Sequence, residues 1–170
     1  MDLQLKDKVI IVTGGAKGIG AGIVQACAAE GAIPIIVGRD ADAGEQVQHE
    51  IQRIGGRCGL ISVELSTSES CSRSVDQVLK DFGRLDVLVN NAGRNDKVGL
   101  EQGNPDEYVA SLNRNLVHYY AMAHYSLPHL KSSRGTIVNI GSKTAVTGQG
   151  STSGYASSKG AIMALTREWA

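Results

Sequence analysis

The sequence predicts an α/β fold built on a doubly wound parallel sheet, from three observations along its 170 residues. Short apolar runs alternate with longer segments in which apolar residues recur at helical spacing. The short runs are apolar at consecutive positions, which is typical of strands buried on both faces of a parallel sheet. Glycine-rich or polar turns follow the strands, at the edge where such sheets bind ligands.

Three strand and helix units fill the first half of the chain. The opening run is rich in β-branched residues, is too short for a helix and ends at two glycines. Glycines also follow the first two helical segments, as expected at helix ends. The predicted strands are residues 8–13, 33–37 and 58–65, and the helices after them are residues 18–30, 42–54 and 68–82.

The second half repeats the pattern around a polar loop at residues 94–103. Pro105 suits the first turn of a long helix that runs to about Leu130, and Pro128 is expected to kink this helix or end it early. A loop rich in Gly, Ser and Thr precedes a last helical pattern. The fourth and fifth strands are predicted at residues 86–90 and 136–140.

Charge and composition exclude several classes of partner. Lys plus Arg equals Asp plus Glu, at 17 each, without a run of like charge, so no nucleic-acid partner is expected. No apolar stretch has the length of a signal peptide or membrane span, so we expect a soluble cytoplasmic protein without a membrane partner. The cysteines are widely spaced and the histidines lack partners at metal-ligand spacing, so reduced thiols and no metal site are expected.

The turn after the first strand, from Gly14 to Gly20, has the pattern Gly-x-x-x-Gly-x-Gly and opens the first predicted helix. Such glycines let a pyrophosphate approach the free N–H groups of a helix N-terminus, as in Rossmann-like folds. A plain tight turn is the alternative, but three glycines after Thr13 exceed what a turn needs. The expected cofactor contacts are Thr13, Gly14, Lys17, Gly18, Ile19 and Gly20.

The end of the second predicted strand, Gly38-Arg39-Asp40, bears on which dinucleotide binds. A carboxylate here would bond the ribose hydroxyls of NAD, whereas a cation favours the extra phosphate of NADP. Gly38 offers no carboxylate, Arg39 can fork onto a phosphate, and Lys17 adds positive charge. We therefore expect NADP, with NAD as the alternative if Asp40 turns toward the ribose.

Tyr155 and Lys159 lie four residues apart in the last helical pattern, so they share one helix face. A phenol has an ordinary pKa of about 10, and a neighbouring ammonium favours its phenolate. Two unit charges ~4 Å apart attract by about 4 kcal/mol at an effective dielectric of ~20, which would suit acid–base chemistry near neutral pH. The pair alone arises by chance in about one in four chains of this composition.

Several motifs together resemble the short-chain dehydrogenase/reductase family along the whole chain. The resemblance implies an NAD(P)-dependent oxidoreductase that transfers a hydride between a nicotinamide cofactor and a hydroxyl or carbonyl substrate. The matching residues, in the family's order and approximate spacing, are Thr13-Gly14-x-x-x-Gly18-x-Gly20, Asn90-Asn91-Ala92-Gly93, Asn115, Ser142 and Tyr155-x-x-x-Lys159.

The resemblance also implies a role for each matching side chain. Tyr155 would be the acid/base, and Lys159 would lower its pKa and hold the nicotinamide ribose. Ser142 would hydrogen-bond the reacting oxygen, with a plain strand-end cap as the alternative. Asn115 would position a proton-relay water. The cofactor pocket would also include Asn91, Ala92, Gly93, Glu64 and Leu65, with Glu64 standing where the family has a shorter Asp.

Parts of this sequence resemble one branch of the family, which contains L-fucose dehydrogenases and related sugar dehydrogenases. These parts are residues 95–96, 118–125, 142–150 and 165–169. Oxidation of a sugar hydroxyl, the anomeric one giving a lactone, is therefore expected. A 3-oxoacyl-thioester reductase is the alternative enzyme. The expected substrate contacts are Ser142, Gln149 and Asn95, with Asp96 and Ser151 as further candidates, although such loop residues could equally be solvated ones.

Only five strands are visible where a doubly wound sheet of six is expected, and the last helical pattern reaches Ala170 without a stop signal. We expect residues 1–170 to form a single NAD(P)-binding Rossmann-like domain, C-terminally incomplete and part of a longer unit. A nucleotide-binding fragment without turnover is the second class of function. The helices from Pro105 and Tyr155 resemble the pair that family members pack across a dimer axis, so a homo-oligomer is expected of the full-length form.

Overall fold

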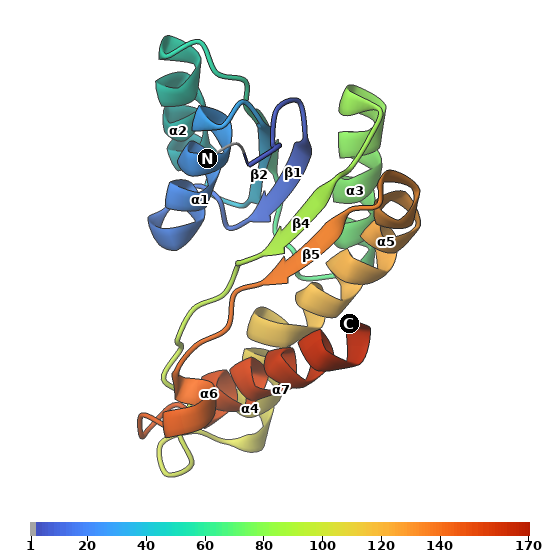
Figure 1. The fold of residues 1–170 in the computed structure, drawn as a ribbon. Coiled ribbons are helices and arrows are strands. Elements are labelled where there is room, and N and C mark those ends of the chain that lie inside the picture. The colour runs from blue at the N-terminus through green and yellow to red at the C-terminus, as the bar shows by residue number, and fades with distance from the viewer. Residues whose placement is uncertain (1–2) are drawn as a thin grey trace.

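The computed structural model describes residues 3–170, which form a five-stranded parallel sheet covered by helices on both faces (Figure 1). The strands lie in the order β3-β2-β1-β4-β5. The predicted α/β fold with a parallel, doubly wound sheet is confirmed, although the third strand is shorter than expected. The strands are Val9–Thr13 (β1), Ile33–Gly38 (β2), Gly59–Ser62 (β3), Val87–Asn90 (β4) and Thr136–Asn139 (β5).

The helices are Gly18–Ala29 (α1), Ala41–Arg53 (α2), Ser68–Phe82 (α3), Pro105–Leu112 (α4), His118–Ser133 (α5), Thr144–Thr147 (α6) and Ser153–Trp169 (α7).

Alternate residues of β1 pack into two different hydrophobic cores, one on each face of the sheet. Ile10 and Val12 pack with apolar side chains of α1 and α2, whereas Val9 and Ile11 pack with those of α3 and α5. This explains why β1 is apolar at every position, since successive side chains point to opposite faces.

The direction of winding reverses at β1. The chain moves from β1 through β2 to β3 at one edge, and α3 then returns it to β4 on the other side of β1. The connections that leave β1 and β4 therefore diverge at their carboxyl ends. In open sheets of this kind a ligand crevice lies at that point.

The long helix predicted from Pro105 is interrupted. A π-helical segment at Asn113–Val117 (η1) separates α4 from α5. Asn115 lies in this widened turn and is fully buried, and its side-chain amide donates to the Ser111 carbonyl over 3.1 Å. The amide thus supplies a donor within the irregular turn, where π-helical geometry often marks functional sites.

Two other details differ from the prediction. Pro128 lies inside α5 and does not end it, because the helix continues to Ser133 and closes at Arg134 in a left-handed conformation (φ 53°). Leu130 is buried, so packing holds the turn that follows the proline. The short helix α6, between β5 and α7, was not predicted at all.

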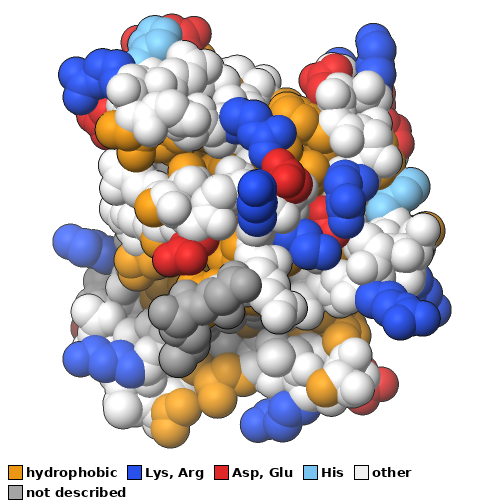
Figure 2. All heavy atoms as spheres, turned by 45° about the horizontal axis from the view of Figure 1, so that its top comes forward, with side chains coloured by type: hydrophobic (Ala, Val, Ile, Leu, Met, Phe, Trp, Pro, Cys, Tyr) orange, Lys and Arg blue, Asp and Glu red, His pale blue; other side chains and the backbone are white. Residues whose placement is uncertain are grey.

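None of the helices within residues 3–170 combines the length and apolar character needed to cross a membrane. In the same part of the chain, no group of three or more His, Cys, Asp or Glu side chains is placed to hold a metal ion. Cys27, Cys58 and Cys71 are free thiols. On the face shown in Figure 2, Lys and Arg side chains lie among Asp and Glu side chains, so opposite charges are interspersed there.

Asp86 ties the loop before β4 to the start of β1. Its buried carboxylate accepts hydrogen bonds from the Val9 backbone (3.0 Å), from the Arg84 guanidinium (2.6 and 2.8 Å) and from the Lys8 ammonium (3.3 Å). Burial by itself would raise the pKa of Asp86, but these donors outweigh it and hold that pKa below its ordinary value.

Replacing this carboxylate should therefore cost stability in a pH-dependent way. Asp86→Asn should lower the free energy of unfolding by about 2 kcal/mol at neutral pH, because charge-assisted hydrogen bonds are lost. Since the folded pKa is depressed, this stabilisation is present above the unfolded pKa of about 4 and disappears as the pH falls through the folded pKa. Urea unfolding at neutral and acidic pH measures the difference.

The matched control is Asp81→Asn, at an exposed carboxylate near the end of α3. It should change the unfolding free energy little at either pH. An equal loss for Asp86→Asn at both pH values would contradict the ionic origin of the effect.

Candidate active site

A cleft of about 960 Å³ opens at the carboxyl ends of the strands, between the turns that follow β1 and β4. The glycine turn after β1, residues 38–40 after β2 and residues 91–94 after β4 line it. Tyr155 and Lys159 on α7 contribute to the same cleft. The structure thus brings the predicted Tyr-Lys pair together with most of the predicted cofactor contacts.

The glycine turn leaves the N-terminus of α1 open to the cleft. Gly14 and Gly18 have left-handed backbone conformations, with φ of 65° and 54°, which glycine adopts without strain. No atom lies within 4 Å of where a Cβ of Gly18 would stand, whereas a Cβ on Gly20 would lie 2.2 Å from the Gly14 oxygen. Lys17 precedes α1 without capping it by its side chain. Space and backbone N–H groups are therefore available for a phosphate.

Thr13 shapes the cleft from beneath and does not itself line it. Its hydroxyl oxygen accepts hydrogen bonds from the backbone N–H groups of Asn91 (2.9 Å) and Ala92 (3.0 Å). The Asn91 side chain donates in return to the carbonyls of Thr13 (2.9 Å) and Gly14 (3.3 Å). These bonds fix the turn after β1 against the turn after β4.

Two ion pairs stand beside the end of β2. Arg39 lies 3.3 Å from Glu64, and Lys17 binds Asp40, with all four side chains substantially exposed. Asp40 also caps α2 by accepting the Ala43 N–H over 3.1 Å. The hydrogen bond from Lys17, followed by that from Ala43, lowers the pKa of Asp40. Both oxygens of Asp40 are thus engaged, while Arg39 lines the cleft with its charge exposed.

Lys159 is almost completely buried, at 3% exposure. Its ammonium donates to the hydroxyl of Tyr119 (2.9 Å) and to the backbone carbonyl of Ile140 (2.7 Å). The ammonium also lies 5.7 Å from the centre of the Tyr155 ring. Burial lowers the pKa of Lys159 to about 8.

Asn115 and Ser142 lie beside the cleft and do not line it. The Asn115 side-chain oxygen accepts the Arg94 N–H over 2.8 Å, which ties η1 to the loop after β4. The Ser142 hydroxyl oxygen accepts bonds from the Thr144 hydroxyl (2.8 Å) and the Thr144 N–H (3.3 Å). Ser142 follows Gly141, which does line the cleft.

The loop residues predicted to touch substrate behave differently from one another. Asn95 and Gln149 are exposed and bond each other over 3.4 Å, so the two loops meet at these side chains. Asp96 is instead turned inward, with 5% side-chain exposure, where it accepts the Ser111 hydroxyl over 2.9 Å and pairs with Arg114. Asp96 is therefore a loop anchor in this structure. Ser151 is exposed and has a left-handed backbone.

Sequence reasoning missed Tyr119 and His118, which approach Lys159 from the start of α5. His118 is buried, with Nε2 3.1 Å from the Arg114 carbonyl and Nδ1 without a partner within residues 3–170. Burial lowers the pKa of His118 to about 4, so its ring is neutral at ordinary pH. Two aromatic residues shortly after Asn115 were a signal, but the π-helical turn shifts the face that a regular helix would assign to them.

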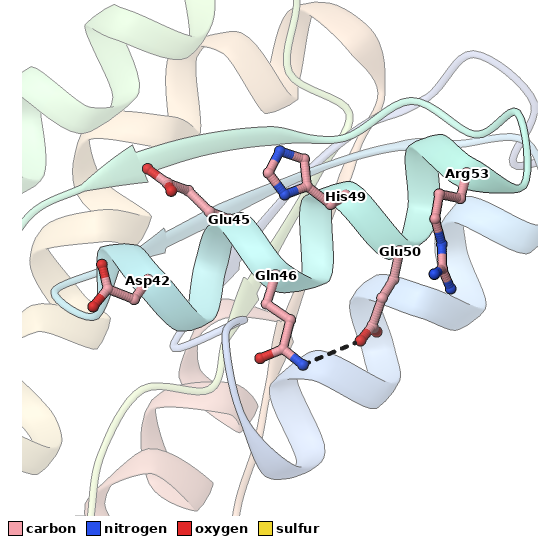
Figure 3. Close-up of a pocket in the computed structure, with 6 residues that line it drawn as sticks. All are labelled: Asp42, Glu45, Gln46, His49, Glu50 and Arg53. Carbon is pink, nitrogen blue, oxygen red and sulfur yellow. Dashed lines mark hydrogen bonds between the residues drawn. The ribbon is translucent and has the colours of Figure 1, made fainter.

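A second hollow, of about 530 Å³, runs along the outer side of α2. Figure 3 shows that its six residues all come from this one helix, with Gln46 bonded to Glu50 over 3.4 Å. A hollow made by a single helix has no opposing wall. It therefore cannot enclose a ligand as the cleft at the strand ends can.

A family model described as short chain dehydrogenase matches residues 8–170. The L-fucose dehydrogenase of Bos taurus is 36% identical over 168 residues, covering 98% of this chain and 61% of its own length. The 3-oxoacyl-(acyl-carrier-protein) reductase FabG of Chlamydia pneumoniae is 32% identical, covering 100% of this chain and 69% of its own length.

The crystal structure of Cj0485 dehydrogenase matches 99% of this chain with a TM-score of 0.94 and 43% identity, and 64% of that chain is covered. This chain thus spans about three fifths of the length of several proteins that it resembles. The family model, the identities and the matching fold agree, and the chain belongs to the short-chain dehydrogenase/reductase family.

Proposed function

We propose that the protein is an NADP(H)-dependent oxidoreductase that transfers a hydride between the nicotinamide and a sugar hydroxyl, such as that of L-fucose. The observation that carries this proposal is that Tyr155 and Lys159 share one cleft with the glycine turn at the start of α1. One cleft therefore offers an acid/base pair and a phosphate position. The residues present fit a dinucleotide, because Gly18 leaves space where α1 presents its first N–H groups.

The cofactor-binding role is assigned to the turns around the cleft. The pyrophosphate would lie against Gly14, Lys17, Gly18, Ile19 and Gly20. The remaining cofactor contacts would come from Arg39, Glu64, Leu65, Asn91, Ala92 and Gly93, with Thr13 acting from below through Asn91 and Ala92.

Tyr155 is assigned the proton transfer. When the substrate alcohol is oxidised, the phenolate of Tyr155 takes the O–H proton while the carbon releases its hydride. A bound nicotinamide supplies the hydride acceptor. The Lys159 ammonium, held 5.7 Å from the Tyr155 ring centre, favours the negative charge that Tyr155 must carry before it accepts the proton.

Ser142 and Asn115 are assigned supporting roles. The Ser142 hydroxyl would bond the reacting oxygen with its own proton, which the bonds it accepts from Thr144 do not use. Asn115 would position a proton-relay water through the irregular η1 turn that it holds in shape. Both roles rest on the resemblance to the family and on the position of these residues beside the cleft.

NADP is proposed over NAD because of the charges at the end of β2. Arg39 is exposed and lines the cleft, whereas Asp40 has its two oxygens engaged with Lys17 and the α2 N-terminus. The carboxylate that would select the ribose hydroxyls of NAD is therefore occupied. Glu64 forms an ion pair with Arg39, but this exposed ion pair is weak enough for a 2′-phosphate to replace Glu64.

A sugar substrate is proposed from the similarity to L-fucose dehydrogenase and from the polar loops beside the cleft. Asn95 and Gln149 carry exposed amides that could bond sugar hydroxyls. The alternative is reduction of a 3-oxoacyl thioester, which the similarity to the FabG reductase favours.

A homo-oligomer is also proposed. Val117, Tyr120 and Leu127 are exposed apolar side chains at helical spacing across η1 and α5, and Met163 on α7 is another. Such a patch on neighbouring helices suits burial against a second copy.

Substrate classes separate the two enzyme proposals. Two assays are compared: oxidation of L-fucose and other aldoses with NADP, and reduction of a 3-oxoacyl thioester with NADPH. The kcat/KM of the sugar oxidation should be the higher of the two. Both are followed by absorbance of the reduced nicotinamide. The opposite order would assign the thioester reductase, and dinucleotide binding without either activity would assign a binding function alone.

Removing the Tyr155 hydroxyl should abolish proton transfer while sparing the cleft. Tyr155→Phe is expected to lower kcat by 10²–10⁴-fold, roughly the contribution of general acid–base catalysis, with little change in the Kd of NADPH. Tyr108→Phe is the control, because its hydroxyl bonds Ser157 outside the cleft. A Tyr155→Phe variant with unchanged kcat would remove Tyr155 from the chemistry.

Cofactor choice tests the role of Arg39. Arg39→Ala should raise the KM for NADP by about 10- to 100-fold, the value of a lost charge-assisted bond, and leave the KM for NAD nearly unchanged. Arg53→Ala, in the last turn of α2 and outside the cleft, should alter neither KM. A strong preference of the unchanged protein for NAD would contradict the assignment.

A further inference from the structure

Tyr119 has the largest side chain among those fully buried within residues 3–170. It lies on α5, one turn beyond Asn115, and its hydroxyl oxygen stands 2.9 Å from the Lys159 ammonium and 3.2 Å from the Ile140 carbonyl oxygen. The ammonium in turn lies 2.7 Å from the same carbonyl. Phenol, ammonium and carbonyl thus form a closed triangle behind the cleft.

Chemistry fixes the direction of each bond in this triangle. A carbonyl oxygen only accepts, so the Tyr119 hydroxyl donates its hydrogen bond to the Ile140 carbonyl. An ammonium only donates, so the Tyr119 oxygen accepts from Lys159. Burial raises the pKa of Tyr119 well above its ordinary value, and nearby Tyr155 raises it further, so Tyr119 remains a neutral phenol. It can hold the ammonium but cannot take its proton.

The ammonium has three protons, and the triangle uses two of them. The third remains for the cleft side, where Tyr155 stands. No carboxylate within residues 3–170 pairs with Lys159, so two neutral oxygens are its acceptors in the structure. A buried charge with so few partners depends strongly on each of them.

We propose that Tyr119 is a positioning residue for the reaction, which keeps Lys159 charged and directed toward Tyr155. This rests on the proposed oxidoreductase function. Tyr119 does not itself line the cleft but bonds Lys159, which does, so its effect on Tyr155 passes through Lys159. The two tyrosines near Lys159 then have different roles: Tyr119 holds the ammonium, and Tyr155 exchanges the substrate proton.

The titration of Lys159 reports on this role. The titratable groups that face the ammonium are Tyr155 from α7 and Tyr119 and His118 from α5, and the loop after β5 offers only the Ile140 carbonyl. His118 and Tyr119 stay neutral around the pKa of about 8 that burial gives Lys159. A shift in that pKa upon losing the Tyr119 hydroxyl therefore reports the lost bond.

The test compares Tyr119→Phe with wild type in the full chain, by NMR titration of lysine Nζ groups, with the Lys159 signal assigned through Lys159→Met. Losing one acceptor should lower the pKa of Lys159 by about one to two units, the equivalent of a hydrogen bond to a charged group. The control is Tyr125→Phe in the middle of α5, which removes a hydroxyl bonded to Ser68 at the start of α3 and should leave the pKa of Lys159 unchanged.

Turnover gives a second readout that a merely structural role would not move. The alkaline limit of kcat should shift to lower pH by the same amount in Tyr119→Phe, while kcat at lower pH, where Lys159 is charged in both proteins, should be similar. A uniform fall of kcat at every pH, or an unchanged Lys159 pKa, would overturn the proposal. If wild type shows no turnover the proposed function fails, yet the titration still decides whether Tyr119 holds Lys159.

A folding failure would also be informative. If Tyr119→Phe does not fold alone, the double variant Tyr119→Phe/Lys159→Met should fold, because no buried ammonium is left that needs the missing oxygen. Circular dichroism and Tm measure this. Failure of the double variant to recover, with Lys159→Met folded by itself, would contradict the proposal.

Discussion

Hydrogen bonds between Thr13 and Asn91 determine the geometry on which the candidate site depends. The sheet reverses its winding between β1 and β4, and the two turns that leave these strands would diverge without a link. The Thr13 hydroxyl receives two N–H groups of the second turn, and the Asn91 amide returns two bonds to the first. Gly20 completes this contact, because any Cβ there would collide with the Gly14 carbonyl. The cleft walls are thus fixed before any ligand arrives.

The same cleft contains a nearly buried ammonium, which burial disfavours. Lys159 sits among neutral partners, and its depressed pKa expresses the desolvation that burial imposes. A purely structural residue at this position would be apolar, as Ile162 is one turn later. Retaining a charge beside Tyr155 therefore makes sense only if the charge acts on something in the cleft. Asp96 and Asn115 hold the loop after β4 and the η1 turn against α4, because both bond Ser111 and Asn115 also accepts the Arg94 N–H.

Sequence reasoning succeeded where one local pattern determines one structure. The β-branched run of β1 is buried on both faces, and the predicted glycine turn joins it to α1. It failed where tertiary contacts decide. Nothing near Asn115 signals a π-helical turn, because the turn depends on a side-chain amide that satisfies a carbonyl. Pro128 remains inside α5 because packing of the following turn outweighs one missing donor. The contact of Tyr119 with Lys159 joins residues 40 apart and has no local signature.

The most direct measurement is a crystal structure of this chain with NADP bound. We expect the pyrophosphate at Gly18 and the N-terminus of α1, the 2′-phosphate beside Arg39 in place of Glu64, and the nicotinamide next to Tyr155. Lys159 should keep its bond to Tyr119 in that complex. A dinucleotide bound elsewhere, such as along α2, or the absence of binding at saturating NADP, would contradict the proposed cofactor site.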